Sequence, residues 1–301
     1  MTYEGKPRAQ SEPRMRVLAH AKINLSLEVL GRREDGYHQV VTVLHTIGMA
    51  DRLSFESFEL LSLDCERLSI PTEQNLVMRA ARLLQQHTGC TLGAAIILEK
   101  GIPAGSGLGG GSSDAATTLK ALNALWGLKL SSVKLHDLAA QLGSDVPFFL
   151  EEGCALAEGR GEDITPLQSA TGLWAVVLVP PFQMPDKTAH LYGLLSNSDF
   201  TDGTVTKKVA ERLRTGVSSL GEGGVGMNAF ERAAMEAFPG LEVERKALIE
   251  AGAPFARVTG SGPALFTLVE SQEDGLRITG RLEESARDVY LVRVVGTSLA
   301  R

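Results

Sequence analysis

Cysteine, net positive charge and long apolar runs are all scarce in this sequence, and each scarcity excludes a class of protein. The three cysteines, Cys65, Cys90 and Cys154, lie far apart and form neither a C-x-x-C pair nor a zinc-like spacing with the six histidines. No apolar run approaches the roughly 20 residues of a transmembrane helix. Residues 1–16 lack the apolar centre of a secretory signal peptide. We therefore expect a cytoplasmic protein with reduced thiols and a flexible tail over residues 1–15.

The balance of charge argues against polyanionic partners. The chain has 30 Lys and Arg against 36 Asp and Glu, a formal net charge of -6. Binding a nucleic acid or an anionic membrane surface would need clustered Lys and Arg, which this balance does not favour. We expect small-molecule substrates only, with no nucleic acid and no membrane, for a monomer or weak homodimer.

What the sequence does have is ample apolar material and an excess of glycine. Hydrophobic residues make up 44% of the 301 residues, which is enough for a sizeable core. A chain of this length exceeds the usual size of one core, so two domains are expected. The 32 glycines exceed the usual share, and five of them fall within the seven residues 105–111.

The first half of the chain reads as a hairpin followed by mixed strands and helices. Residues 21–30 alternate between apolar and polar side chains, which predicts a half-buried strand, and residues 39–47 return after an Asp-Gly turn. Further elements are expected as a helix over 72–87 ended by Gly89, a strand over 94–100, and helices over 114–126 and 131–142, the last capped by Ser131.

The second half changes pattern. A strand over 173–179, helical material to about residue 252, two strands flanking 260–262, a helix over 272–287 and a strand over 290–295 follow one another. With the middle helices counted as one layer, this is the β-α-β-β-α-β order of a ferredoxin-like module. We expect an α/β (α+β) protein with domains over 16–171 and 172–301.

The glycine-rich segment reads IPAGSGLGGGSSDAA over residues 102–116. Glycine permits positive φ and lets backbone N–H groups approach a ligand, while the helix that follows points its positive end into the same space. This combination predicts a phosphate cradle, although a mobile surface linker would also be rich in glycine. The spacing fits G-x-G-x-x-G, but a second helix follows the first where a dinucleotide fold requires a strand. A Walker A loop would need lysine where Gly111 stands, and protein-kinase signatures are absent.

This segment resembles the phosphate-binding loop of the GHMP kinases, the superfamily of galactokinase, homoserine kinase and mevalonate kinase. The pairing of AKINLSL (21–27) and REDGYH (33–38) with GSDVPFF (143–149) is similar to the branch that phosphorylates diphosphocytidyl methylerythritol, and VTGSGPALF (258–266) matches the third superfamily motif. The resemblance implies a two-domain fold with a ribosomal-protein-S5-domain-2-like nucleotide domain and a ferredoxin-like C-terminal domain. It also implies ATP-dependent phosphorylation of the tertiary 2-hydroxyl of that alcohol in non-mevalonate isoprenoid synthesis.

The resemblance also implies individual site residues. Lys22 and Asp145 fall on the catalytic lysine and aspartate. Substrate contacts fall on Asn24, Tyr37, His38, Asp145, Thr188 and Tyr192. Of these, Tyr37 and Tyr192 are expected to stack on opposite faces of the cytosine ring. ATP contacts fall on Asn75 and Lys100, which are expected near the adenine, and on Pro103, Ala104, Gly105, Ser106, Gly107, Leu108, Gly109, Gly110, Gly111, Ser112 and Ser113. One departure is Asn228-Ala229, where the family commonly has Asn-Asp.

In the mechanism that this implies, positioning and charge stabilisation supply most of the catalysis of phosphoryl transfer. Asp145 accepts the proton of the attacking hydroxyl, and Lys22 neutralises charge on the phosphoryl group. Mg2+ is expected to be held by phosphates and water, without a dedicated protein metal site. Two alternatives remain open: another GHMP kinase of the homoserine or mevalonate type, and a non-catalytic ATP-binding sensor on the same fold. Retention of both Lys22 and Asp145 argues against the sensor.

Overall fold

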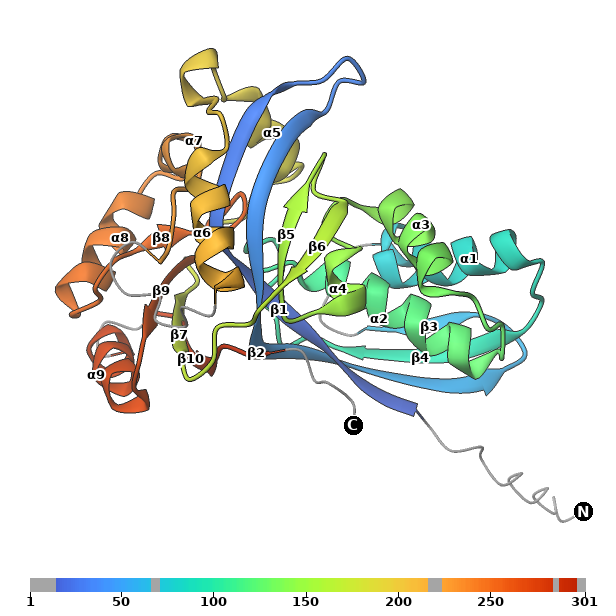
Figure 1. Cartoon of the computed structure of the whole chain (residues 1–301). Coiled ribbons are helices and arrows are strands. Elements are labelled where there is room, and N and C mark those ends of the chain that lie inside the picture. Colours follow the sequence, from blue (N-terminus) through green and yellow to red (C-terminus); the bar gives the residue numbers. More distant parts are fainter. Residues whose placement is uncertain (1–14, 66–70, 216–223, 284–286, 297–301) are drawn as a thin grey trace, which may run out of the picture.

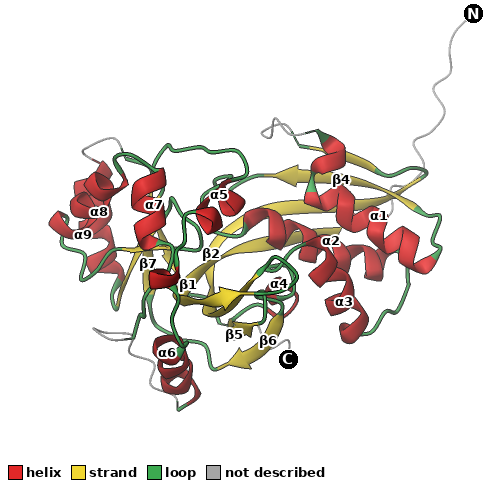
Figure 2. Cartoon of the chain, turned by 90° about the horizontal axis from the view of Figure 1, so that it is seen from above, coloured by secondary structure: helices red, strands yellow, loops and turns green. Residues whose placement is uncertain are grey.

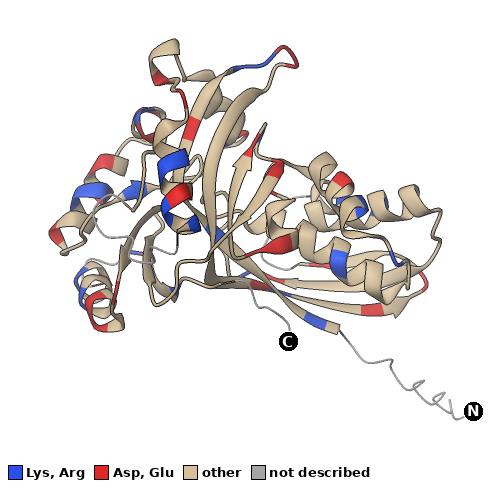
Figure 3. Cartoon of the chain, viewed as in Figure 1, with Lys and Arg blue, Asp and Glu red and all other residues tan. Residues whose placement is uncertain are grey.

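Two β-sheets with helices packed on them make up the described part of the chain (Figure 1). The computed structural model describes residues 15–65, 71–215, 224–283 and 287–296. All but the last residue of the expected tail over 1–15 therefore lies outside the described residues. Acidic and basic residues are interspersed over the helices that pack on the two sheets (Figure 3), in line with the mixed charge of the sequence.

The expected hairpin is present and is longer than the sequence pattern suggests. It joins β1 (Met15–Arg32) to β2 (His38–Phe58), which pair antiparallel along nearly their whole length. The expectation that β1 is half-buried is wrong, because its polar side is covered as well: Lys22, Asn24, Ser26 and Glu28 are each at most 4% exposed. Segments from the C-terminal half lie against this strand, through bridges from Leu27 to Asn228 and from Val29 to Phe200.

The hairpin belongs to the larger sheet, whose strands run in the order β3-β4-β2-β5-β6 with β1 also paired to β2. The other strands are β3 (Ser62–Asp64), β4 (Gly93–Glu99), β5 (Cys154–Glu158) and β6 (Asp163–Leu167). Helical elements associated with this sheet, seen from above in Figure 2, are η1 (Thr72–Gln74), α1 (Leu76–Thr88), α2 (Gly110–Leu125), α3 (Ser132–Leu142) and α4 (Phe148–Glu151). Buried residues of the sheet and of these helices, such as Phe55, Leu84, Leu119 and Phe148, form one core cluster.

Local signals fixed several helix boundaries. The Ser131 hydroxyl accepts from the Lys134 amide and caps α3, and Gly89 ends α1 in the left-handed region at φ 68°, so both expectations are confirmed. The helix expected from residue 72 is instead a 3-10 turn followed by α1, because Asn75 caps the latter with its own side chain. The helix expected from Asp114 begins four residues earlier, because the end of the glycine-rich segment supplies the first turn.

The smaller sheet has the strand order β10-β7-β9-β8, and all its neighbours pair antiparallel. Its strands are β7 (Trp174–Leu178), β8 (Arg257–Val258), β9 (Leu265–Val269) and β10 (Val289–Arg293). The helical elements are α5 (Lys187–Gly193), η2 (Asn197–Asp199), α6 (Thr204–Arg214), α7 (Glu231–Ala237), α8 (Leu241–Glu250) and α9 (Gln272–Glu283). The predicted β-α-β-β-α-β order is confirmed for this half, with several helices standing where one layer was counted.

The two halves share core material. The larger sheet ends at Leu167 and the smaller begins at Trp174, so the expected division at residue 172 falls between the sheets and stays a prediction. One hydrophobic cluster contains Ile23 and Val43 of the hairpin together with Phe266 of β9. Helix α6 packs on β1 and β2 (Figure 1). The hairpin therefore links the halves, and the polar side chains of β1 lie where they meet. Within the described residues, no helix is both long and apolar enough to cross a membrane.

Candidate active site

The glycine-rich segment links β4 to α2 and has the geometry of an anion cradle. Gly105, Gly107 and Gly109 have φ of 68°, 93° and 77°, and α2 begins at Gly110 directly after them. Three turns into the left-handed region curl the backbone around the positive end of a 16-residue helix. Such an arrangement suits an anion, and the phosphate contacts of this loop stay a prediction.

The cradle is packed so tightly that two glycines have no room for a side chain. A Cβ on Gly109 would lie 2.7 Å from Cζ of Phe149 and 3.0 Å from Cγ of Lys22. A Cβ on Gly107 would collide with the carbonyl oxygen of Thr259, in the turn between β8 and β9. The absence of a side chain therefore lets the loop pack closely against both halves of the chain, in addition to permitting positive φ.

Of the other loop residues that were predicted to contact ATP, some are buried and hold the loop in place, and others are exposed. The Ser106 hydroxyl is buried and donates to the carbonyl of Pro103 at 2.7 Å. Leu108 is fully buried, and its carbonyl accepts from the backbone N–H of Lys22 at 2.9 Å. The Ser113 hydroxyl is buried without a hydrogen-bond partner among the described residues. Ala104, Gly105 and Gly111 are exposed, and Ser112 is half-buried.

Lys22 and Asp145 meet at one end of the cradle. The Lys22 ammonium lies 3.3 Å from a carboxylate oxygen of Asp145 and donates to the Asn24 side-chain oxygen at 2.7 Å. The Lys22 side chain is 3% exposed, whereas that of Asp145 is 39% exposed. Lys22 belongs to β1, and the more exposed Asp145 belongs to the turn before α4. An accessible carboxylate can act as a general base, so this pair is suited to the activation of a hydroxyl group.

The turn between β8 and β9 closes the site from the C-terminal half. The Thr259 hydroxyl accepts from the backbone N–H of Asn24 at 3.0 Å and donates to its side-chain oxygen at 3.2 Å. A Cβ on Gly260 would lie 3.1 Å from the Lys22 ammonium. The third motif of the sequence thus lies against the first two, and Asn24 is held by bonds that also orient Lys22.

Lys187 is a residue of this region that sequence reasoning missed. It is the first residue of α5, and its ammonium donates to the carbonyl of Gly105 at 2.7 Å and to the carbonyl of Gly262. Burial, and then the charge of Lys22, lower the pKa of Lys187 to about 8. Its position directly before the predicted Thr188 was the available signal, and that alone does not distinguish it from a surface lysine.

Two of the predicted substrate residues, His38 and Tyr192, belong to an aromatic group, and Tyr37 lies apart from it. The rings of His38 and Tyr192 stack at 4.5 Å, and Phe230 meets Tyr192 edge-on at 4.8 Å. Burial lowers the pKa of His38, and its Nε2 is buried without a hydrogen-bond partner among the described residues. Burial, and then the charge of Asp145, raise the pKa of Tyr192.

Tyr37 is 53% exposed at the tip of the hairpin, and the Arg160 guanidinium lies over its ring at 4.9 Å. The sequence had placed Tyr37 and Tyr192 on opposite faces of one base. In the structure His38, not Tyr37, lies on the Tyr192 ring, so that pairing stays a prediction. The Thr188 hydroxyl lies 3.3 Å from that of Ser261 and ties α5 to the β8–β9 turn.

Asn75 and Lys100, expected near the adenine, both make structural contacts. Asn75 caps α1, accepting from the Val77 amide at 2.9 Å. The Lys100 ammonium pairs with Asp51 and, at 2.8 Å, with Asp114 of α2. Burial opposes the charge of Lys100, but these two carboxylates raise its pKa above the ordinary value. Lys100 thereby anchors α2 to the sheet, and its adenine contact stays a prediction.

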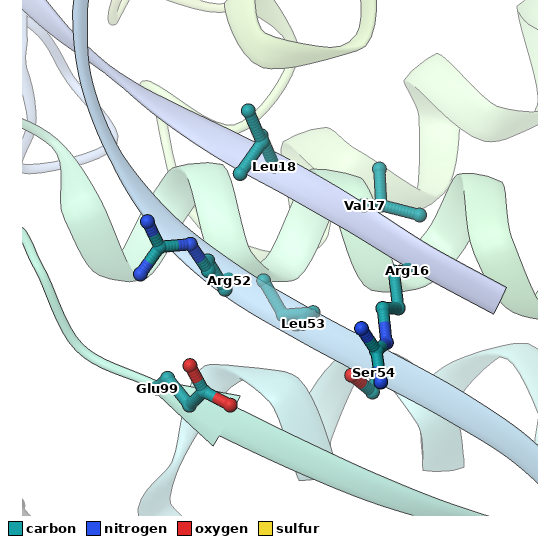
Figure 4. A pocket seen from close by; sticks show the side chains of 7 residues that line it. All are labelled: Arg16, Val17, Leu18, Arg52, Leu53, Ser54 and Glu99. Carbon is teal, nitrogen blue, oxygen red and sulfur yellow. The ribbon is translucent and has the colours of Figure 1, made fainter. Parts of the chain in front are cut away.

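Two shallow hollows lie on the strands away from Lys22 and Asp145. One, of about 260 Å³, is lined by residues of β1, β2 and β4, including Leu18, Arg52 and Glu99 (Figure 4). The other, of about 460 Å³, shares Arg52 and Glu99 and extends to Lys100. Across the residues that the structure describes, no three His, Cys, Asp or Glu side chains gather as a metal site.

Comparison with known proteins identifies the class. The family model described as the GHMP kinases N terminal domain matches residues 75–153, and the model described as GHMP kinases C terminal matches residues 208–288. The chain therefore belongs to the GHMP kinases, a family of phosphotransferases, and the resemblance inferred from its motifs is confirmed.

Within that family, the chain is similar to 4-diphosphocytidyl-2-C-methyl-D-erythritol kinases. It is 42% identical to the one from Dehalococcoides mccartyi strain BAV1, over 93% of this chain and 98% of that protein. It is 38% identical to the one from Symbiobacterium thermophilum, over 93% of this chain and the whole of that protein. A crystal structure of 4-(cytidine 5'-diphospho)-2C-methyl-D-erythritol kinase superposes with a TM-score of 0.78 at 35% identity, covering 94% of this chain and 100% of that one.

The fold extends to more distant kinases. Homoserine kinase from Cytophaga hutchinsonii superposes with a TM-score of 0.72 at 20% identity, covering 98% of each chain. At that identity the likeness shows the fold alone. The two family models and the more similar kinase structure confirm the expected two-domain GHMP kinase fold.

Proposed function

We propose that this enzyme transfers the terminal phosphate of ATP to the tertiary 2-hydroxyl of 4-diphosphocytidyl-2-C-methyl-D-erythritol. The observation that carries the proposal is the Lys22–Asp145 pair, 3.3 Å apart at the end of the glycine cradle. The choice of acceptor rests on relatives of that name, which are about 40% identical over nearly the whole chain.

In this proposal Asp145 accepts the proton of the attacking hydroxyl, and Lys22 stabilises negative charge on the transferring phosphoryl group. Lys22 is fixed by its bond to Asn24, so little reorganisation accompanies the reaction. The cradle over 105–113 holds the phosphates of ATP through backbone N–H groups and the unpartnered Ser113 hydroxyl.

Mg2+ would be held mainly by the phosphates of ATP and by water. Its contribution when bound is to neutralise phosphate charge.

The cytidine end of the acceptor would lie against the aromatic group. Tyr192 offers a ring face for stacking once His38 turns aside, and the buried Nε2 of His38 is available to the polar edge of the base. Stacking accepts any base, so hydrogen bonds must select cytosine.

The test supplies ATP and Mg2+ with the cytidine-linked alcohol, homoserine and mevalonate in separate reactions. ADP formation is measured, and phosphorus NMR identifies the product. We expect a new phosphate monoester from the cytidine-linked alcohol only. Turnover of homoserine or mevalonate in its place would favour another GHMP kinase activity. ATP binding without turnover of any acceptor would favour the sensor.

A further inference from the structure

Lys187 occupies an unusual electrostatic position for a lysine that the mechanism above does not use. Its ammonium donates to two backbone carbonyls, Gly105 of the cradle and Gly262 of the β8–β9 turn. It forms no ion pair with a carboxylate among the described residues, although Lys22 and Lys100 both do. Lys187 is half-buried, and carbonyl dipoles compensate its ammonium less completely than a full negative charge would.

The ionised groups around Lys187 carry more positive than negative charge. Two ammonium groups, Lys22 and Lys187, face one carboxylate, Asp145, so the group carries one excess positive charge. The two lysines are close enough that the charge of Lys22 lowers the pKa of Lys187, while Asp145 acts in the opposite direction. An anion bound between them would relieve the repulsion and supply Lys187 with an ionic partner.

The location indicates which anion. Gly105 opens the cradle that faces the phosphates, and Gly262 belongs to the turn whose Gly260 lies against the Lys22 ammonium. Lys187 therefore lies within the same space as the Lys22–Asp145 pair. It comes from α5, in the half of the chain opposite to the cradle.

We propose that Lys187 is a further phosphate-binding residue, whose ammonium leaves the carbonyls of Gly105 and Gly262 to contact the terminal phosphate of ATP opposite Lys22. This inference rests on the proposed use of the cradle for ATP and is independent of which alcohol is phosphorylated. The contact spans the two halves, so ATP would draw α5 and the cradle together through its terminal phosphate.

The competing explanation is a structural latch, in which the two carbonyl bonds simply hold α5 in place. The variant Lys187→Gln separates the two, because its amide still donates to carbonyls but carries no charge. Lys187→Arg keeps the charge, and Lys208→Met on α6 is a control that removes an exposed lysine outside the site.

The experiment is calorimetric titration of ATP and of ADP into each variant, with Mg2+ present and acceptor omitted. For Lys187→Gln we expect the Kd of ATP to rise tenfold or more and that of ADP to rise less than threefold, because ADP lacks the terminal phosphate. Lys187→Arg should keep most of the preference for ATP, and Lys208→Met should match the unmodified protein. Equal losses for the two nucleotides, or no loss in a folded Lys187→Gln, would overturn the inference and leave the proposed function standing. If the unmodified protein bound neither nucleotide, both proposals would fall, whereas a failure to phosphorylate the cytidine-linked alcohol would leave the titrations valid.

Discussion

Gly109→Ala probes the contact on which the site depends, the packing of the cradle against Lys22. Gly109 has φ of 77°, where an L-residue loses about 1–2 kcal/mol relative to glycine. The new Cβ would also lie 2.7 Å from the ring of Phe149, which is 1% exposed, and 3.0 Å from Cγ of Lys22. Overpacking of this kind costs about 1–3 kcal/mol, so the total is about 2–5 kcal/mol of unfolding free energy.

A matched control isolates the steric part. Gly127, just beyond α2, has φ of 62°, and a Cβ there meets nothing within 4 Å. Gly127→Ala therefore carries the backbone strain alone, and the difference between the two variants measures the clash. Urea unfolding of both proteins gives that difference directly.

Activity supplies an independent check. Displacing the Lys22 stem moves its ammonium relative to Asp145, so we expect kcat of Gly109→Ala to fall at least tenfold, whereas Gly127→Ala should retain normal kcat. The reasoning is refuted if the two variants lose equal stability, or if Gly109→Ala keeps full kcat, because Phe149 and Lys22 would then not constrain the loop.

Three further predictions concern charge and stacking. Asp145→Asn should lower kcat by about 10²–10⁴-fold with the Kd of ATP within threefold, because the amide cannot accept the proton and the cradle is untouched; near-normal turnover would remove Asp145 from that role. Tyr192→Ala should raise the KM of the acceptor roughly tenfold and leave that of ATP unchanged, while Tyr192→Phe keeps the ring and stays near normal; a lower Tm with acceptor binding intact would instead make Tyr192 a packing residue. Beside Lys22 and Asp145, the pKa of Lys187 falls from 10.5 to about 8 in the folded protein. Between pH 8 and pH 10.5 the unfolded chain therefore binds more protons than the folded protein. The contribution of Lys187 to the free energy of unfolding accordingly rises with pH across that window. Relative to Lys187→Met, the unmodified protein should therefore gain up to about 3 kcal/mol in unfolding free energy between pH 7 and pH 10.5, measured by urea unfolding of both; a constant difference would contradict the lowered pKa.

The structural features that local sequence signals specify could be predicted. The positive φ values of the cradle follow from its glycines, the start of α3 from Ser131, and the end of α1 from Gly89. The succession of strands and helices in the C-terminal half followed from its periodic segments, whereas the strand order within the smaller sheet came from the structure. The catalytic assignment of Lys22 and Asp145, by contrast, came from resemblance, since alternation alone makes Lys22 a residue of a solvated face.

Only the tertiary structure decided what covers that face. The C-terminal half lies against β1 and buries Lys22 and Asn24, so the polar face of this strand lines the candidate site. Thr259 and Lys187 reach it from 235 residues and from 82 residues away along the chain, through bonds to Asn24 and to Gly105. Periodicity and capping act over a few neighbouring residues, so they specify each helix and strand. The partners of a buried charge are set by how distant elements pack, and a single sequence carries no local mark of that packing.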